Sequence, residues 1–98
     1  MEIKNSPWGQ VDHQEKMKET SHEIYLVSTP KHGGLVLKDG SNIQKTVEDT
    51  YGHTKLYLDY VVKQEGLVFY EEDCACLMVL ALINPDKYQE QLEFWLKK

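Results

Sequence analysis

The sequence predicts one α+β domain spanning residues 1–98, in which a small antiparallel sheet packs against two to four helices. Three observations lead to this fold class. A β-rich segment at 23–28 and another at 35–38 flank a turn that contains proline and paired glycine. An apolar run at 74–83 is long enough for a buried helix. The segment 85–97 has apolar residues at helical spacing.

The sheet is predicted to start from a hairpin. Its two strands, 23–28 and 35–38, are rich in β-branched and aromatic residues, which favour strands. A further short strand is predicted at 67–70, directly before the apolar run. The polar N-terminal part of the chain, including Glu15–Glu19, supplies an exposed loop or an edge strand.

Helices are predicted at about 41–50, 54–65, 71–83 and 85–97. Ser41 and Gln44 have the spacing of a capping box, which begins the first helix. Asn84 caps the last helix, and Pro85 suits its first turn. The 54–65 segment fits a helical face and strand alternation equally well. We favour the helix because polar residues lead up to Gly66, as at a helix end.

The charge balance argues against direct nucleic-acid binding. The chain has a net charge of -5, and all 11 of its cations are lysine. Arginine, the usual residue for bidentate recognition of phosphate and guanine, is absent. No apolar stretch approaches the ~20 residues that a membrane span needs, so no membrane contact is expected. The N-terminus lacks the apolar segment of a signal peptide, and a cytoplasmic protein is therefore expected.

No catalytic, metal-binding or cofactor-binding motif is present. We therefore expect no catalytic residues, no bound metal and no cofactor. The four histidines lack the paired spacing of zinc sites. Cys74 and Cys76 are predicted to be buried, reduced thiols, because a C-x-C pair is poorly placed to close a disulfide.

The most informative feature is an acidic triplet, Glu71, Glu72 and Asp73, which directly precedes the apolar run. In the first turn of a helix, negative charges interact favourably with the unsatisfied backbone amides and with the helix dipole. Each such charge stabilises the helix by ~0.3–1 kcal/mol. Because a helix turns about 100° per residue, the three side chains fan out and at least one faces inward or along the sheet. Two other interpretations stay open: a carboxylate that holds the glycine-rich turn, and a catalytic carboxylate.

The turn at His32, Gly33 and Gly34 is a second candidate for a site. Its glycines permit positive φ and close approach of backbones, which suits anion binding. His32 beside them could serve in acid–base chemistry. The alternative is that a hairpin turn simply needs glycine at these positions.

Two aromatic residues complete the set of candidates. Trp8 is expected as a core residue, or else as the wall of a pocket beside His32 and Tyr70. Phe94 points off the apolar face of the last helix and is predicted to be exposed.

Three motifs occur in order along the chain: Pro7-Trp8-Gly9, Ser28-Thr29 with His32-Gly33-Gly34-Leu35, and Tyr70-Glu71-Glu72-Asp73-Cys74. Together they resemble an uncharacterised small domain family of bacteriophages and bacterial mobile elements. The resemblance covers about residues 6–84 and leaves the final helix as an addition. That family has no established activity, so the resemblance implies a setting. It also implies a single site formed by Trp8, His32, Tyr70, Glu72 and Asp73.

Two hypotheses on function follow, and we favour the first. It is a small acidic phage or mobile-element protein that binds and inhibits a host protein, such as a nucleic-acid-binding defence component (an anti-CRISPR or anti-restriction type). An acidic surface can compete for a basic groove. The second is a small-molecule-binding or hydrolytic module that uses the His-Gly-Gly turn and the Glu-Glu-Asp carboxylates. The residues predicted to bind are Trp8, His32, Gly33, Gly34, Tyr70, Glu71, Glu72, Asp73 and Phe94.

Overall fold

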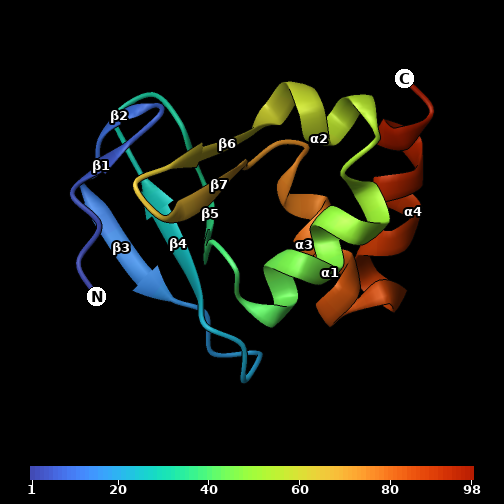
Figure 1. Ribbon diagram of the computed structural model, residues 1–98, viewed down its shortest axis with the longest axis horizontal. Coiled ribbons are helices and arrows are strands. Elements are labelled where there is room, and N and C mark those ends of the chain that lie inside the picture. Colours follow the sequence, from blue (N-terminus) through green and yellow to red (C-terminus); the bar gives the residue numbers. More distant parts are fainter.

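A five-stranded antiparallel sheet with helices on one face is the centre of the computed structural model, which describes residues 1–98 (Figure 1). The strands are β1 (Asn5–Ser6), β2 (Gly9–Gln10), β3 (His13–Lys16), β4 (Ile24–Ser28), β5 (Gly33–Lys38), β6 (Val61–Gln64) and β7 (Leu67–Glu71). The helices are α1 (Asn42–Tyr51), α2 (Lys55–Tyr60), α3 (Cys76–Ile83) and α4 (Pro85–Leu96). The strand order is β3-β4-β5-β7-β6, and β1 pairs separately with β2. The α+β fold class is confirmed, as are the predicted hairpin and the N-terminal edge strand.

The two faces of the sheet carry separate apolar cores. Between β5 and β7, Leu35 lies opposite Tyr70 and Val36 lies opposite Phe69. Successive residues of a strand point to opposite faces. Leu35 and Tyr70 therefore join the larger core under the helices, whereas Val36 and Phe69 join a smaller core on the outer face.

Residues 3–11, which we name the outer layer, cover the outer face of the sheet. Ile3 is buried there, and Trp8 packs edge-on against Phe69 with 5.8 Å between the ring centroids. The side chain of Gln14, on β3, accepts a hydrogen bond from the Ile3 amide at 2.7 Å. Trp8 is thus a partly buried core residue, the first of its two predicted roles.

Two predicted helix starts are confirmed. Ser41 Oγ accepts a hydrogen bond from the Gln44 amide at 3.4 Å at the start of α1. Asn84 Oδ1 accepts from the Lys87 amide at 3.3 Å, and Pro85 is the first residue of α4. The capping box at α1 is only half formed, because the Gln44 side chain turns into the core instead of returning to Ser41.

The predicted helix at 54–65 is wrong beyond residue 60. The segment contains α2 and then β6, which pairs with β7 as a hairpin. Glu65 and Gly66 have positive φ angles of 53° and 78° and form the two-residue hairpin turn. The polar residues before Gly66 therefore lead into a hairpin turn rather than a helix end.

The predicted helix at 71–83 is wrong in its first turn. Glu71 ends β7, and the Glu72 amide donates to the Gly33 carbonyl at 3.0 Å, next to the sheet ladder. Helix α3 begins only at Cys76, without a side-chain cap and without an acidic residue in its first turn. The acidic triplet therefore belongs to the strand end and the following turn. No helix in the structure combines the length and the apolar character needed to span a bilayer.

Candidate functional site

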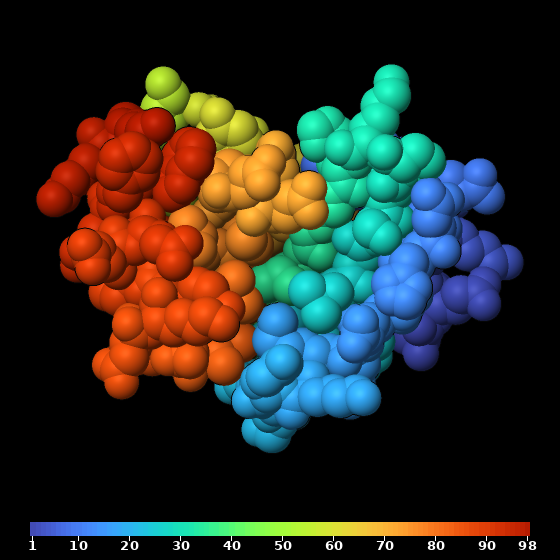
Figure 2. Space-filling view, turned by 180° about the vertical axis from the view of Figure 1, so that it is seen from behind, coloured from blue at the N-terminus to red at the C-terminus, as the bar shows by residue number.

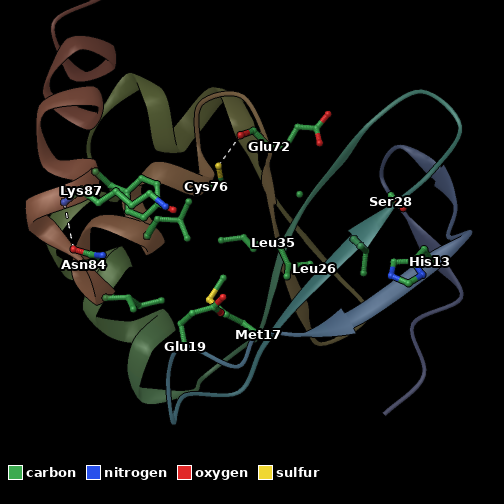
Figure 3. A pocket seen from close by; sticks show the side chains of 15 residues that line it. His13, Met17, Glu19, Leu26, Ser28, Leu35, Glu72, Cys76, Asn84 and Lys87 are labelled. Carbon is green, nitrogen blue, oxygen red and sulfur yellow. Dashed lines mark hydrogen bonds between the residues drawn. The ribbon is translucent and has the colours of Figure 1, made fainter.

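A cleft of ≈ 570 Å³ opens between the sheet and the last two helices (Figure 3). In Figure 2, α3 and α4 (orange to red) lie on one side of this hollow and β3 and β4 (blue to cyan) on the other. Its apolar lining consists of Met17, Leu26, Val27, Leu35, Cys76, Leu80, Ile83 and Tyr88. Its remaining lining residues are His13, Glu19, Ser28, Gly34, Glu72, Asn84 and Lys87. We refer to it as the sheet–helix cleft.

The floor of the cleft contains an exposed leucine. Leu26, on β4, lies directly opposite Leu35, on β5, so the two side chains share the helix-facing side of the sheet. Leu35 is 2% exposed, whereas Leu26 is 38% exposed. Leu26 therefore points toward the layer of helices without being covered by it. An apolar group exposed within a concave surface is available to a ligand.

The rim of the cleft carries charges of both signs. His13 Nε2 lies 3.8 Å from the Glu15 carboxylate on β3, an ion pair when the histidine is protonated. The carboxylates of Glu19 and Glu72 take part in no ion pair. Lys87 supplies a cation on the α4 side. No group of three or more histidine, cysteine or acidic residues is arranged to hold a metal ion.

The two glycines after His32 lie within β5, so their predicted place in a turn is wrong. The turn is instead Thr29–His32, closed by the Thr29 amide, which donates to the His32 carbonyl at 2.7 Å. Neither glycine has positive φ. Both are needed for close approach, which confirms the other reason that favoured glycine here.

The neighbours of Gly33 and Gly34 leave no room for a side chain. A Cβ on Gly33 would lie 2.8 Å from the Val27 carbonyl oxygen and 2.9 Å from Glu72 Oε2. A Cβ on Gly34 would lie 2.6 Å from Trp8 Cη2, and closer still to the Tyr70 carbonyl oxygen. The glycine pair thus lets Glu72 of the acidic triplet and Trp8 of the outer layer both pack onto β5.

The structure brings together only part of the predicted binding set. Gly34 and Glu72 line the cleft, and Gly33 lies beside Glu72. Asp73 is exposed and Glu71 is half-buried, but neither lines the cleft. His32 is exposed on its turn and forms no ion pair with a carboxylate.

The predicted residues Trp8, Tyr70 and Phe94 lie elsewhere. Trp8 packs on the outer face of the sheet, whereas Tyr70 is buried on the helix face. These two aromatic residues therefore form no common pocket with His32. Phe94 is 59% exposed on α4, as predicted, and does not line the cleft.

Sequence patterns did not single out the residues that make the cleft. Leu26 is two residues after Ile24 and lies on the same face of β4, so its sequence position is that of an ordinary core residue of a strand. Its exposure depends on where α3 and α4 pass over the sheet, which no local pattern records. Lys87 and Tyr88 reach the cleft because α4 packs along α3. Of the cleft residues, only Gly34 and Glu72 belong to the predicted binding set, the first as a glycine and the second as part of an acidic triplet.

The thiols of Cys76, which lines the cleft, and of nearby Cys74 are expected to react slowly. Cys76 is 7% exposed, and its Sγ donates a hydrogen bond to the Glu72 carbonyl at 2.6 Å. Burial is the main cause that raises the pKa of Cys76 from its ordinary 9.0 to about 12, and burial also raises the pKa of Cys74. The reactive thiolate is therefore scarce near neutral pH. A thiol-exchange dye should label the native protein far more slowly than the protein in denaturant, and equal rates would contradict this.

The same shift predicts a loss of stability at alkaline pH. Because the folded protein raises the pKa of Cys76, it binds this proton more tightly than the unfolded chain does. The resulting stabilisation is complete below pH 9.0 and is lost as the pH rises toward about 12. The urea midpoint should fall over this range, and it should fall less in Cys76→Ala.

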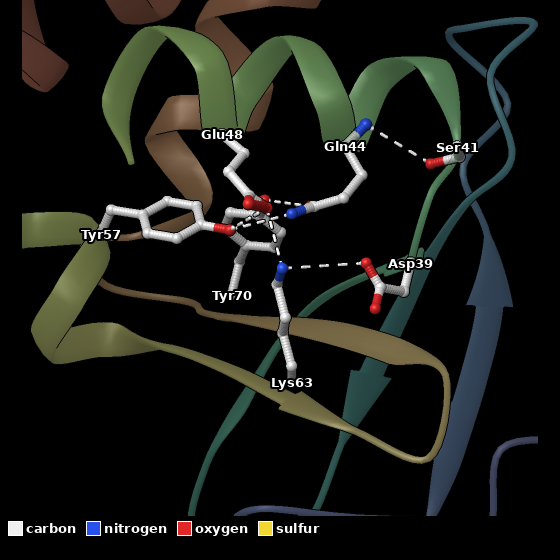
Figure 4. Close-up of polar contacts among 7 residues, drawn as sticks. All are labelled: Asp39, Ser41, Gln44, Glu48, Tyr57, Lys63 and Tyr70. Carbon is white, nitrogen blue, oxygen red and sulfur yellow. Dashed lines mark hydrogen bonds and ion pairs between the residues drawn. The ribbon is translucent and has the colours of Figure 1, made fainter. Parts of the chain in front are cut away.

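A second polar cluster, which we name the Gln44 network, lies between α1 and the β6–β7 hairpin (Figure 4). Gln44 is 1% exposed; its Nε2 donates to Tyr57 Oη at 2.9 Å, and its Oε1 accepts from the Tyr70 hydroxyl. At the exposed end, Lys63 Nζ lies 2.8 Å from Glu48 Oε2. Burial raises the pKa of Tyr70, so its phenol stays protonated and donates. Since every buried polar side-chain atom has a partner, this cluster is a structural support.

Comparison with known proteins places the chain in a family without assigning an activity. No curated protein and no solved structure matches it. A family model does match, over residues 1–95, and that range includes all of α4 except its last residue, Leu96. The last helix is therefore part of the family's domain rather than an addition to it. The chain belongs to the family described as a domain of unknown function, DUF7007.

Proposed function

We propose that the protein acts by binding another protein, an apolar side chain of which enters the sheet–helix cleft. The observation that carries this proposal is Leu26, which is 38% exposed on the floor of a cleft of ≈ 570 Å³. Apolar groups in a concave, partly desolvated surface are the usual anchors of a protein interface. Polar groups on the rim then set orientation and exclude other partners.

The partner we propose is a basic protein. The chain has a net charge of -5, and the carboxylates of Glu19 and Glu72 on the cleft rim form no ion pair within the molecule. Such a surface steers basic proteins toward the cleft. In this proposal the protein is an inhibitor from a phage or mobile element. It acts in the cytoplasm on a nucleic-acid-binding host component and occupies its basic groove.

Replacing Leu26 with asparagine should weaken partner binding at least about tenfold, ~1.4 kcal/mol, because a polar amide replaces the exposed anchor without changing charge. The partner would first be captured at low salt, identified by mass spectrometry and purified. Isothermal titration then compares the wild type with Leu26→Asn. The matched control is Leu58→Asn, since Leu58 is 67% exposed on α2 and lies outside the cleft.

Two outcomes would contradict the proposal. One is the absence of any retained protein at low salt. The other is a purified partner that binds wild type, Leu26→Asn and Leu58→Asn with equal affinity. Because both substitutions are at exposed leucines, the thermal midpoints should stay close to that of the wild type.

Small-molecule binding is a second candidate, and the size of the cleft favours it. Ligand sites commonly enclose about 300–1,000 Å³ and have apolar walls with a few polar groups. Glu72 is the one member of the predicted acidic triplet that lines this cleft. A compound that raises the thermal midpoint of the wild type but not of Leu26→Asn would favour this candidate over a protein partner.

A further inference from the structure

We propose that the exposed face of α4 is a second contact surface, which holds lysine or arginine side chains of the basic partner. We name it the α4 face and define it by Asp86, Glu90, Glu93 and Phe94. It rests on the proposed protein-binding function and extends it to a different side of the molecule. Helix α4 lies at the outside of the helical layer, away from the sheet (Figure 1).

Two neighbouring rings near the end of α4, Phe94 on this face and Trp95 beside it, already hold an ammonium group. The rings of Phe94 and Trp95 are nearly perpendicular, at 89°, with centroids 6.1 Å apart. Lys98 Nζ lies 4.6 Å from the Phe94 centroid and 4.4 Å from the Trp95 centroid. A cation over an aromatic ring is attracted by the negative face of the ring. The ring pair therefore has the geometry to bind a side-chain ammonium or guanidinium.

Carboxylates line the side of the helix that carries Phe94, whereas Trp95, nine residues after Asp86, lies on the opposite side and packs partly against the larger core. Asp86, Glu90 and Glu93 are spaced at i, i+4 and i+7, so they share one face, and Phe94 lies next to Glu90. They line a shallow hollow together with Phe94 and Lys97. None of the three carboxylates takes part in an ion pair. In contrast, Glu48 on α1 pairs with Lys63 at 2.8 Å.

Phe94 itself is exposed to solvent on this face. It is 59% exposed, although a helix that only covered a core would place a polar residue there. An aromatic ring among unpaired carboxylates is complementary to a basic segment, which offers both charge and aliphatic stems for packing. An acidic face is repelled by anionic lipid surfaces, so we commit to a protein segment as the occupant.

The α4 face and the sheet–helix cleft are joined through one helix. Lys87 and Tyr88, at the start of α4, line the cleft, whereas Phe94 lies toward its end. A partner whose apolar anchor enters the cleft can therefore also reach the α4 face. In the free protein, Lys98 occupies the rings and competes with the incoming cation.

The test uses a short oligolysine peptide as the probe, with an oligoglutamate of equal length as the negative control. Heteronuclear NMR follows the indole N–H signals of Trp8 and Trp95, the two tryptophans, which lie on different sides of the molecule. Oligolysine should shift the Trp95 signal and leave the Trp8 signal in place. Added salt should weaken binding, because exposed charges are screened.

Variants test whether oligolysine binds to this face or is attracted only by the overall negative charge of the protein. Phe94→Ala should weaken oligolysine binding about fivefold, and Glu90→Gln with Glu93→Gln should weaken it by a similar factor. The matched control is Asp49→Asn, since Asp49 is an exposed carboxylate on α1 outside the face. It should bind as the wild type does. Lys98→Ala should bind more tightly, because the competing ammonium is gone.

The proposal is overturned if Phe94→Ala and Asp49→Asn bind oligolysine equally, which would indicate diffuse attraction. It is also overturned if Lys98→Ala does not tighten binding, or if Lys98→Ala dissociates a dimer seen by sedimentation, since a second copy would then be the occupant. Failure here leaves the cleft proposal standing if Leu26→Asn still weakens binding of the purified partner. If Leu26→Asn has no effect while Phe94→Ala does, the α4 face stands alone.

Discussion

Replacing Gly34 with alanine is expected to lower the free energy of unfolding by at least about 3 kcal/mol, the upper range for overpacking a core. The new Cβ would overlap the Tyr70 carbonyl oxygen and lie 2.6 Å from Trp8 Cη2. The Tyr70 carbonyl oxygen belongs to the backbone of the paired strand β7, so it cannot rotate away from the new methyl group. Since single domains are stable by only about 5–15 kcal/mol, urea unfolding followed by circular dichroism should show a large shift of the midpoint.

The control for this prediction is Gly40→Ala. Gly40 has φ of 85° with nothing within 4 Å of an added Cβ, so only backbone strain of about 1–2 kcal/mol is expected. Trp8→Ala should not rescue Gly34→Ala, because the Tyr70 carbonyl remains in place. A Gly34→Ala protein as stable as Gly40→Ala would show that the two strands can separate at little cost.

Replacing Gln44 with leucine is expected to lower the free energy of unfolding by about 2–3 kcal/mol. The leucine has a similar volume, but it leaves the buried Tyr70 hydroxyl without its acceptor. Tyr57 loses a donor at 2.9 Å yet keeps its own weak contact to Glu48 at 3.4 Å. Most of the lost stability therefore comes from the Tyr70 hydroxyl, which is left buried without a hydrogen-bond acceptor.

A double-mutant cycle tests that origin. Tyr70→Phe removes the stranded hydroxyl, so the pair Gln44→Leu and Tyr70→Phe should be more stable than Gln44→Leu alone. Gln91→Leu, at an exposed position of α4, should change stability by only about 0.5 kcal/mol. Simple additivity of the two buried substitutions would contradict the proposed role of the network.

Elements with a local chemical signal could be predicted from the sequence. Asn84 and Pro85 define the start of α4 through a side-chain cap and a fixed φ, both of which act within a few residues. The hairpin of β4 and β5 follows from β-branched content around a proline turn. Neither inference needs knowledge of distant parts of the chain.

The misplaced elements depend on long-range pairing. Val61 and Val62 suit a helix face or a strand, and the choice is made by the partner strand β7. The acidic triplet suits a helix N-terminus, yet Glu71 pairs with Gly34 of a strand far away in sequence. Pairing across the sheet satisfies the backbone N–H and C=O groups around Glu71, so the helix begins only after this segment.

The candidate site was predictable only where its residues have unusual chemistry. Glu72 and Gly34 drew notice as a charge and a glycine, and both line the cleft. Leu26 is a candidate anchor because the helices leave its side chain exposed, and its exposure depends on where those helices lie over the sheet. The resemblance implied that Trp8 and Tyr70 share a site, but strand alternation places them on opposite faces.

The separation of the two cores has a consequence for how the molecule opens. The outer layer is held by a small apolar cluster and by the Gln14 side chain, whereas the helices share the larger core. Regions with few buried contacts open at lower free energy than the whole domain. Residues 3–11 can therefore detach while the helical side stays folded. Trp8 and Trp95 lie in these two regions, so their fluorescence reports partial and global opening as separate events.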